Sequence, residues 1–148
     1  MDKSKPKLRF DGSVWCNLDI ALRNADQVFR RVVQPLGLTV IEWYILRALY
    51  QQDGQHASDL AQAVGRAATS FTPNLDRLTD KNLVERRADP QDRRAVCIYL
   101  TEEGQKIKDD VHAAAERIDS EMKKQFSPEE FNSFLNVLST LQTEEFLF

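Results

Sequence analysis

The 148-residue sequence lacks long apolar runs and glycine-rich loops. No apolar stretch approaches the length of a transmembrane helix, and the lysine-rich start, residues 1–12, has no apolar signal-peptide core. Only five glycines are present, and no glycine-rich phosphate loop, Ser-His-Asp arrangement or carboxylate pair can be recognised. We therefore expect a cytoplasmic protein without a membrane partner, and an enzyme is disfavoured.

Cysteine and histidine are also scarce, with two residues of each. Cys16 and Cys97 are widely separated, and His56 and His112 belong to no Cys-x-x-Cys or His-x-x-x-His pattern. We expect two free thiols, no metal site and no other cofactor. Because no Lys, Arg or His lies within one helical turn of Cys16 to activate it, a buried structural thiol is favoured there. Cys97 is expected on the outward face of a strand.

The residues that are present are typical of a globular chain, with 42% hydrophobic residues, 29% charged residues and a net charge of −3. The charge is unevenly distributed. Residues 66–94 hold seven basic and five acidic residues, whereas the rest of the chain holds 13 basic and 18 acidic ones. The positive charge is therefore concentrated in one segment, which is compatible with a local nucleic-acid surface.

Apolar residues spaced by three and four predict a first helix from Ser13 to about Val33, after a flexible arm over residues 1–12. A capping box, in which the Thr39 hydroxyl and the Glu42 carboxylate satisfy each other's backbone amides, begins a second helix that ends near Gln51. A short third helix is expected over about Ala57–Val64.

A fourth helix is expected to begin near Thr69, because Pro73 lacks an N–H and should lie in its first turn. Asn82 tolerates the left-handed conformation that ends a helix. Two short strands over 83–87 and 95–100 then form a half-buried ribbon. A long helix capped by Thr101 and a last helix that begins at Ser127 complete the pattern.

This order of elements is typical of a winged helix-turn-helix domain, in which one helix enters the DNA major groove. The start of the fourth helix offers short hydrogen-bonding side chains and one apolar surface suited to a thymine methyl group. These residues are Thr69, Ser70, Thr72, Pro73 and Asn74. At the hairpin tip, Arg93 and Arg94 suit a narrow minor groove. A polar helix start alone is only a cap and an Arg-Arg turn alone is only a solvated hairpin, so their joint occurrence carries the interpretation.

The sequence also resembles the MarR family of bacterial regulators over nearly its whole length. The resemblance is carried by residues 70–78, by residues 81–86, by the Asp-Pro-Gln-Asp-Arg-Arg wing at 89–94 and by Leu-Thr-Glu-Glu-Gly at 100–104. It implies a mainly α fold with a small β-wing, in a single domain over residues 13–148. Helices within 13–37 and 102–148 would form a homodimer, and residues 38–101 would form the DNA-binding lobe.

The resemblance further implies a dimer that binds a pseudo-palindromic operator in double-stranded DNA and represses transcription. Ser70, Thr72 and Pro73 would approach bases, and Arg94, oriented by Asp92, would enter the minor groove. We add Arg77 and Arg86 to the predicted DNA contacts. Large apolar residues of the terminal helices also favour a dimer, since a monomer of this size would not bury them all: they are Trp15, Phe29, Phe126, Phe131, Phe134, Phe146 and Phe148.

Relatives of this kind commonly release DNA when a small aromatic or phenolic effector binds. A pocket for such an effector is predicted from an aromatic wall with nearby charges: Trp15, Arg23, Trp43, Tyr44, His56, Asp59 and Arg66. The same aromatic residues are equally well explained as core or interface residues. Two alternatives remain open at this point: a thiol-oxidation sensor that uses Cys16, and a winged-helix module for protein–protein contact.

Overall fold

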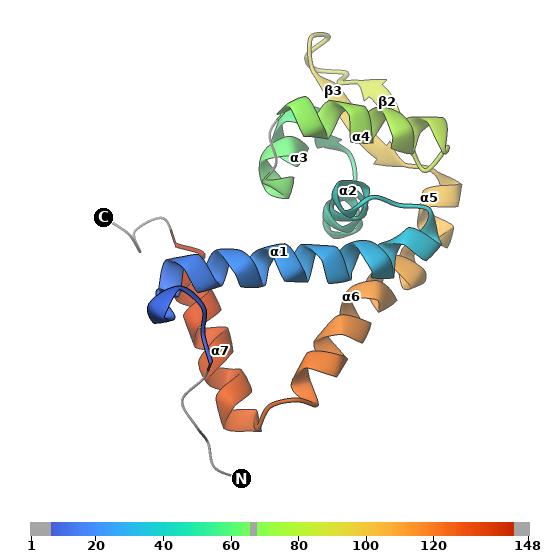
Figure 1. Cartoon of the computed structure of the whole chain (residues 1–148). Coiled ribbons are helices and arrows are strands. Elements are labelled where there is room, and N and C mark those ends of the chain that lie inside the picture. Colours follow the sequence, from blue (N-terminus) through green and yellow to red (C-terminus); the bar gives the residue numbers. More distant parts are fainter. Residues whose placement is uncertain (1–6, 66–67, 144–148) are drawn as a thin grey trace. The chain divides into compact units, whose positions relative to one another are not determined.

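The computed structural model describes residues 7–65 and 68–143, and it divides into two compact units with the boundary between His112 and Ala113. The elements of the first unit, in chain order, are the 3-10 turn η1 (Phe10–Gly12), α1 (Val14–Val33), the 3-10 turn η2 (Gln34–Leu36), α2 (Val40–Gln51), β1 (Gln55–His56), α3 (Ala57–Val64), α4 (Ala68–Asp80), β2 (Val84–Ala88), β3 (Val96–Leu100) and α5 (Glu102–Lys106). Helix α6 (Lys108–Lys123) crosses the boundary, and α7 (Pro128–Leu141) belongs to the second unit (Figure 1). The mainly α fold with a small β-wing is confirmed.

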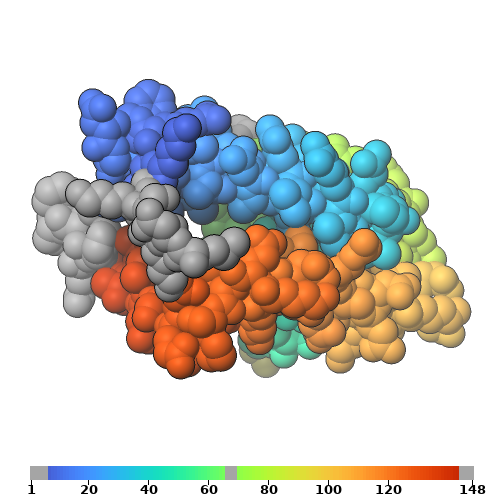
Figure 2. All heavy atoms as spheres, turned by 60° about the horizontal axis from the view of Figure 1, so that its bottom comes forward, coloured from blue at the N-terminus to red at the C-terminus, as the bar shows by residue number. Residues whose placement is uncertain are grey.

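Helix α1 begins where the sequence predicts, because the Ser13 side chain accepts a hydrogen bond from the amide of Cys16. Cys16 itself is half-buried, so the expectation of a fully buried thiol is wrong. In Figure 2 the side chains of α1 form a continuous blue band along one face of the molecule. Val14 and Trp15, at the start of this helix, are both largely exposed.

The segment before α1 is attached to that helix. The Asn17 side chain accepts a hydrogen bond from the Arg9 amide over 2.9 Å and donates one to the Arg9 carbonyl over 2.6 Å. The turn η1 and these two bonds thus lie within the stretch expected to be a flexible arm, and residues 1–6 of that arm lie outside the described residues.

The helix-turn-helix follows local signals closely. The Thr39–Glu42 capping box is present at the start of α2, and the structure bounds α3 as predicted. Gly65 ends α3 with a positive φ of 65°, a conformation that L side chains rarely adopt. Asn82 has a φ of 57° after α4, which confirms its predicted role at the end of that helix.

Pro73 lies deeper in α4 than the sequence predicts. Because α4 begins at Ala68, Pro73 occupies its second turn, and the prediction that this proline lies in the first turn is wrong. An unbroken helix would have used an amide at this position to bond the carbonyl four residues earlier. The helix tolerates this loss, and it continues to Asp80.

The sheet has three strands in the order β1-β3-β2, with both pairs antiparallel. Sequence reasoning missed β1, which is only two residues long. Its residue His56 is the register partner of Cys97 on β3, and Arg87 of β2 faces Cys97 from the other side. Cys97 is therefore covered and only 6% exposed, so its predicted outward position is wrong. Val96 is instead the exposed residue of this strand.

The core of the first unit lies where α2, α3 and α4 pack against β2 and β3. Its fully buried side chains are Val33, Ile45, Leu46, Leu49, Leu60, Leu78, Val84, Ile98 and Val111. Trp43 is also buried, and its Nε1 donates a hydrogen bond to the Val111 carbonyl over 2.8 Å. Satisfying the indole N–H in this way lets the whole ring contribute to the apolar core.

The predicted long helix after the wing is interrupted. Thr101 caps α5 as expected, but the backbone leaves helical geometry at Ile107 before α6 begins. Gly104 explains the local packing, since a Cβ there would lie 2.1 Å from the Leu83 carbonyl oxygen. The Gly104 carbonyl also accepts a hydrogen bond from the Tyr50 hydroxyl over 2.6 Å, which competes with helical bonding where the break occurs. Burial raises the pKa of Tyr50 to about 12, so this hydroxyl remains a donor.

The second unit contains most of α6 and the whole of α7. Ser127 forms a capping box with Glu130 at the start of α7, and Pro128 occupies the first helical position, as predicted. Phe134, Leu135 and Val137 of this helix are exposed. Among the described residues no single helix has both the length and the apolar character of a membrane span; α1 with η2 and α2 meet that criterion only together, as a pair bent by 73°.

Candidate nucleic-acid interface

The exposed face at the start of α4 is made of small side chains. Ser70, Thr72 and Pro73 are all exposed there. The side chain of Thr69, which was predicted to join them, lies outside the described part of the structure. These three residues present two hydroxyl groups and one apolar ring on an exposed face of α4. Such a surface has the size and chemistry needed to approach base edges.

Asn74 does not belong to this exposed face, so its prediction as a surface contact is corrected. It is only 5% exposed, and its Nδ2 donates to the Ser70 carbonyl over 2.5 Å. Its Oδ1 accepts hydrogen bonds from the Thr39 hydroxyl over 2.6 Å and from Arg77 over 2.7 Å. A buried amide needs such partners, and here they connect α4 to the start of α2.

A buried carboxylate completes this connection. Glu42 is 0% exposed, and its two oxygens accept from Arg77 Nε over 2.9 Å and from Lys81 Nζ over 2.5 Å. Lys81 Nζ also donates to the Gly37 carbonyl over 2.6 Å. We call Thr39, Glu42, Asn74, Arg77 and Lys81 the α2–α4 anchor. It fixes the direction of α4 through charge-assisted hydrogen bonds that connect the two helices.

The anchor gives Arg77 two partners within the protein, Glu42 and Asn74, so its predicted DNA contact would have to be made beside these bonds and stays a prediction. The sequence predicted Glu42 only as the partner of Thr39 in the capping box. A further signal was available, since Arg77 and Lys81 are four residues apart and therefore share one face of α4. The local sequence pattern did not indicate that this face would contact the carboxylate of Glu42, which lies 35 residues before Arg77.

Arg86 is also engaged within the protein. From β2 it reaches α4, where its guanidinium lies 2.5 Å from the Asp76 carboxylate and 3.3 Å from the Thr79 hydroxyl. The predicted DNA contact of Arg86 stays a prediction, since these bonds use only part of its five N–H donors. The pair joins the base of the wing to the outer side of α4.

The wing is held by its own backbone. The Asp89 carboxylate accepts from the Gln91 amide over 2.9 Å, and the Asp92 carboxylate accepts from the Arg94 amide over 3.0 Å. Asp92 thus orients the backbone of Arg94 rather than its guanidinium. Arg93 and Arg94 are exposed, and in the described part of the chain neither has an ion-pair partner. Both guanidinium groups are free to meet an anion.

The root of the wing carries a histidine–carboxylate pair. His56 Nε2 lies 2.7 Å from Asp89 Oδ2, and its Nδ1 lies 3.7 Å from Asp59 Oδ2. The hydrogen bond with Asp89 raises the pKa of His56, and the neighbouring carboxylates add to this effect. The pKa of Asp89 is lowered, first by the Gln91 amide and then by His56. Burial raises the pKa of the nearby Cys97 thiol.

The structure does not gather the predicted effector-pocket residues around one cavity. Trp15 is 70% exposed at the start of α1, whereas Trp43 is in the core. His56 and Asp59 lie at the wing root, and Arg66 is outside the described residues. Tyr44 packs on Trp43 with ring centroids 5.1 Å apart. The predicted aromatic wall is therefore not assembled in this structure, because Trp43 is buried in the core whereas Trp15 and Tyr44 are exposed.

A different cleft of about 1040 Å³ lies between α1, the start of α2 and α4. Of the predicted pocket residues, Arg23 lines it, with its guanidinium paired to Asp19. Its other lining residues are Leu22, Asp26, Gln27, Arg30, Val33, Gln34, Leu38, Thr39, Val40, Ile41, Asn74 and Arg77. Three members of the α2–α4 anchor therefore border this cleft.

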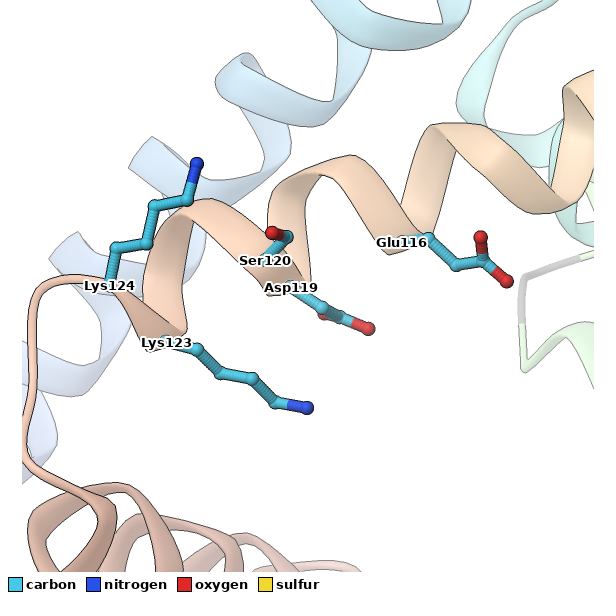
Figure 3. A pocket seen from close by; sticks show the side chains of 5 residues that line it. All are labelled: Glu116, Asp119, Ser120, Lys123 and Lys124. Carbon is cyan, nitrogen blue, oxygen red and sulfur yellow. The ribbon is translucent and has the colours of Figure 1, made fainter.

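A second hollow lies on α6 within the second unit, and its lining is polar and charged. Glu116, Asp119 and Lys123 project to one side of the helix, whereas Lys124 projects to the other (Figure 3). Lys124 pairs with Glu121 over 2.7 Å. Charges of both signs at helical spacing are the ordinary pattern of a solvated face, so this hollow is not a ligand site on present grounds.

A short helix, a turn, a second helix with an exposed polar start and a hairpin with free arginines define a winged helix-turn-helix protein. Residues 38–96 match the family model of the MarR family. The structure also resembles that of the transcriptional regulator PA4135, with 29% sequence identity and a TM-score of 0.75; the match covers 88% of this chain and 96% of that chain. Over residues 38–96 the chain is therefore similar to the MarR family, and it shares the winged helix-turn-helix fold of the regulator PA4135.

Two further structures share the fold. A probable transcriptional regulator from Pseudomonas aeruginosa is 24% identical with a TM-score of 0.76, and the match covers 90% of this chain and 99% of that chain. A mutant MarR from E. coli, complexed with operator DNA, is 22% identical with a TM-score of 0.76, and the match covers 85% of this chain and 91% of that chain.

Proposed function

We propose that this chain is a transcriptional regulator of the MarR family that binds a pseudo-palindromic operator in double-stranded DNA as a homodimer, represses transcription there, and is released by a small ligand. Two observations together carry the proposal. Helix α4 is fixed by the α2–α4 anchor and exposes small polar side chains at its start. The arginines of the wing tip have no ion-pair partner within the described residues. The operator complex of the E. coli MarR mutant supports DNA as the ligand of this fold.

Helix α4 would read sequence through Ser70, Thr72 and Pro73. The hydroxyls suit hydrogen bonds to base edges, and the proline ring suits a thymine methyl group. Reading bases requires a helix that keeps one direction, because a small rotation would move every contact. The buried pairing of Glu42 with Arg77 and Lys81 supplies that constraint.

The wing would contribute charge. Within the described residues Arg93 and Arg94 have no ion-pair partner, so they can neutralise phosphates or enter a narrow minor groove without breaking an internal ion pair. Arg77 and Arg86 are paired with Glu42 and Asp76, so a DNA contact by either would compete with an internal ion pair. Of the four predicted arginines, we therefore expect Arg93 and Arg94 to contribute most to DNA affinity.

Exposed apolar residues support the dimer. On α1, Val14, Trp15 and Leu22 are exposed, and on α7 Phe134 and Leu135 are exposed. Large apolar side chains at such density on two helices are typical of an interface that a second copy covers. A two-fold dimer would present two copies of α4, and these must lie about 34 Å apart to reach successive major grooves on one side of the duplex.

The cleft beside α1 suits an anionic ligand. Arg23, Arg30 and Arg77 border it, as do the polar side chains of Thr39 and Asn74. An aromatic or phenolic acid that bound Arg77 would compete with Glu42 for the same guanidinium. Because that ion pair helps to fix α4, the ligand would alter the direction of the helix and so lower DNA affinity.

Selection of bound fragments from genomic DNA, followed by gel-shift titration at several salt concentrations, tests the proposal. We expect a steep decrease of affinity with salt, since phosphate contacts release counterions. Thr72→Ala and Pro73→Ala should change the sequence preference more than the salt slope, and Arg94→Ala should lower the salt slope by about 1 for each protomer of the dimer. Lys106→Ala, which breaks an exposed pair with Glu103, is the matched control and should change neither.

Two outcomes would contradict the proposal. A chain that sediments as a monomer at working concentration has no dimer to span two half-sites. A dimer that binds no genomic fragment at low salt would favour a protein–protein contact module instead.

A further inference from the structure

Three metal-ligating side chains meet at the root of the wing, although they are far apart in the sequence. One donor atom each from His56, Asp89 and Cys97 lies within 4.8 Å of the other two. The sheet explains this meeting. His56 and Cys97 are direct register partners on β1 and β3, so their side chains share one face. Asp89 follows β2 two residues after Arg87, the other register partner of Cys97.

We propose that His56, Asp89 and Cys97 form a binding site for a divalent transition-metal ion, with Zn²⁺ as the ion that the donor set fits best. The site was not expected from the sequence, because no motif spacing unites positions 56, 89 and 97. Metal binding here does not depend on the DNA-binding function proposed above, so either proposal can fail without the other.

The donor set selects the class of ion. One imidazole nitrogen, one carboxylate oxygen and one thiolate sulfur form the mixed N/O/S environment that Zn²⁺ and Co²⁺ accept, whereas Mg²⁺ and Ca²⁺ prefer oxygen alone. Three protein ligands leave the fourth tetrahedral position to water. With Cys97 as thiolate, Asp89 ionised and His56 neutral, the ligand charges balance those of a divalent ion, which suits a part-buried site.

The spacing requires only small movements. Tetrahedral ligands about 2.0–2.3 Å from zinc lie roughly 3.3–3.8 Å from one another. His56 Nε2 and Asp89 Oδ2 are now 2.7 Å apart, so they would separate slightly to admit the ion. Both side chains are only part-buried and can move in this way, whereas Cys97 is held within the central strand.

A neighbouring carboxylate would complete the site. Metal-bound histidines usually donate their second ring N–H to a carboxylate or carbonyl, which fixes the tautomer. Asp59 Oδ2 lies 3.7 Å from His56 Nδ1, on the opposite side of the ring from Asp89. With the metal on Nε2, a small movement of Asp59 would bring it to hydrogen-bonding distance of Nδ1. Asp59 is thus a positioning residue.

The ion would connect three elements that the chain joins only loosely. His56 precedes α3, Asp89 begins the wing loop and Cys97 lies in the central strand. A bound ion would therefore fix the wing loop to the helix-turn-helix with three coordination bonds in place of one hydrogen bond. The expected structural result is a wing that opens less often, measurable as slower amide exchange in residues 89–95.

Cobalt titration of the reduced full-length protein tests the site directly. We expect one Co²⁺ per chain and a near-ultraviolet thiolate-to-cobalt charge-transfer band, which reports sulfur ligation. Cys97→Ser should abolish the band, whereas Cys16→Ser, which changes the other cysteine, should leave it intact. Zn²⁺ should displace Co²⁺ and bleach the band.

Variants of the other ligands test the site independently if the Cys97→Ser protein fails to fold. His56→Gln and Asp89→Asn should weaken Co²⁺ binding strongly, and Asp59→Asn should weaken it by about tenfold as an outer residue. His112→Gln is the histidine control and should bind as the unchanged protein does. The proposal is overturned if Co²⁺ gives no band, if the band survives Cys97→Ser, or if the His56 and His112 variants bind equally.

Discussion

Helix α4 and the wing are two parts of one candidate interface, yet they are held in opposite ways. Helix α4 is fixed from behind by contacts with α2, in which a fully buried Glu42 meets two cations from residues 35 and 39 positions later. In the described part of the chain, the bonds at the wing tip are local, such as that from the Arg94 amide to the Asp92 carboxylate. Long-range polar contacts of this interface reach α4 and the root of the wing, where His56 meets Asp89, but not the tip.

This difference fits what each part is proposed to do. Base readout needs a rigid helix, because hydrogen bonds to base edges depend on direction. Charge neutralisation by a wing arginine depends mainly on distance, so a mobile tip can still perform it. The comparison predicts that variants of the anchor lower stability, whereas variants of the wing tip lower DNA affinity and leave stability unchanged.

The largest expected effect follows Glu42→Gln. The amide keeps the shape of the side chain but removes the charge that balances Arg77 and Lys81, so we expect the free energy of unfolding to fall by about 2 kcal/mol. The two cations are 48% and 37% exposed, and water moderates the loss. Urea denaturation followed by circular dichroism measures it.

Glu121→Gln is the matched control for this variant. Glu121 pairs with Lys124 on an exposed face of α6, and its loss should cost less than about 1 kcal/mol. Equal losses in the two variants would mean that burial of the α2–α4 anchor adds nothing to its strength.

Arg94→Ala tests the prediction that a wing-tip variant lowers DNA affinity and leaves stability unchanged. Because Arg94 has no ion-pair partner in the described part of the chain, its removal should leave the urea midpoint unchanged. DNA affinity should fall by about tenfold for each half-site, or roughly 1.4 kcal/mol for each Arg94 removed. A gel-shift titration at fixed salt provides the measurement. Unchanged affinity would remove the wing from the proposed mechanism.

Asp92→Ala should give a smaller effect of the same kind. The substitution removes the acceptor for the Arg94 amide at the turn, which is a single exposed hydrogen bond. We expect a decrease of about 0.5–1 kcal/mol in DNA affinity, because Arg94 would sample more directions before binding. Asp92→Asn retains a carbonyl acceptor and should restore most of the affinity. If both variants bind equally weakly, the charge of Asp92 matters and the turn does not.

The elements that the sequence predicted well depend on neighbours along the chain. Ser13, Thr39 and Ser127 begin helices as expected, since each cap bonds an amide three residues later. Asn82 ends α4 through its own backbone preference. These features need no knowledge of the tertiary fold, which is why the order of helices and the wing could be predicted.

The features that were missed depend on distant partners. The role of Glu42 depends on the packing of α2 against α4, which the sequence does not reveal. Strand β1 is too short to show an alternation of apolar and polar residues. The break at Ile107 follows from Tyr50 and Gly104, which are separated by 54 residues. The wrong placement of Cys97 has the same origin, because its cover comes from His56 on a strand that periodicity does not reveal.

The smallest expected effect concerns an ion pair that joins the two regions. Arg86 of β2 contacts Asp76 of α4, and both side chains are substantially exposed, so the pair should contribute only about 0.5 kcal/mol. A double-mutant cycle with Arg86→Ala and Asp76→Ala isolates this coupling, and urea denaturation measures each corner. A coupling above about 2 kcal/mol would show that the wing base and α4 form one rigid body, and the contrast between an anchored helix and a locally held wing would then apply to the tip alone.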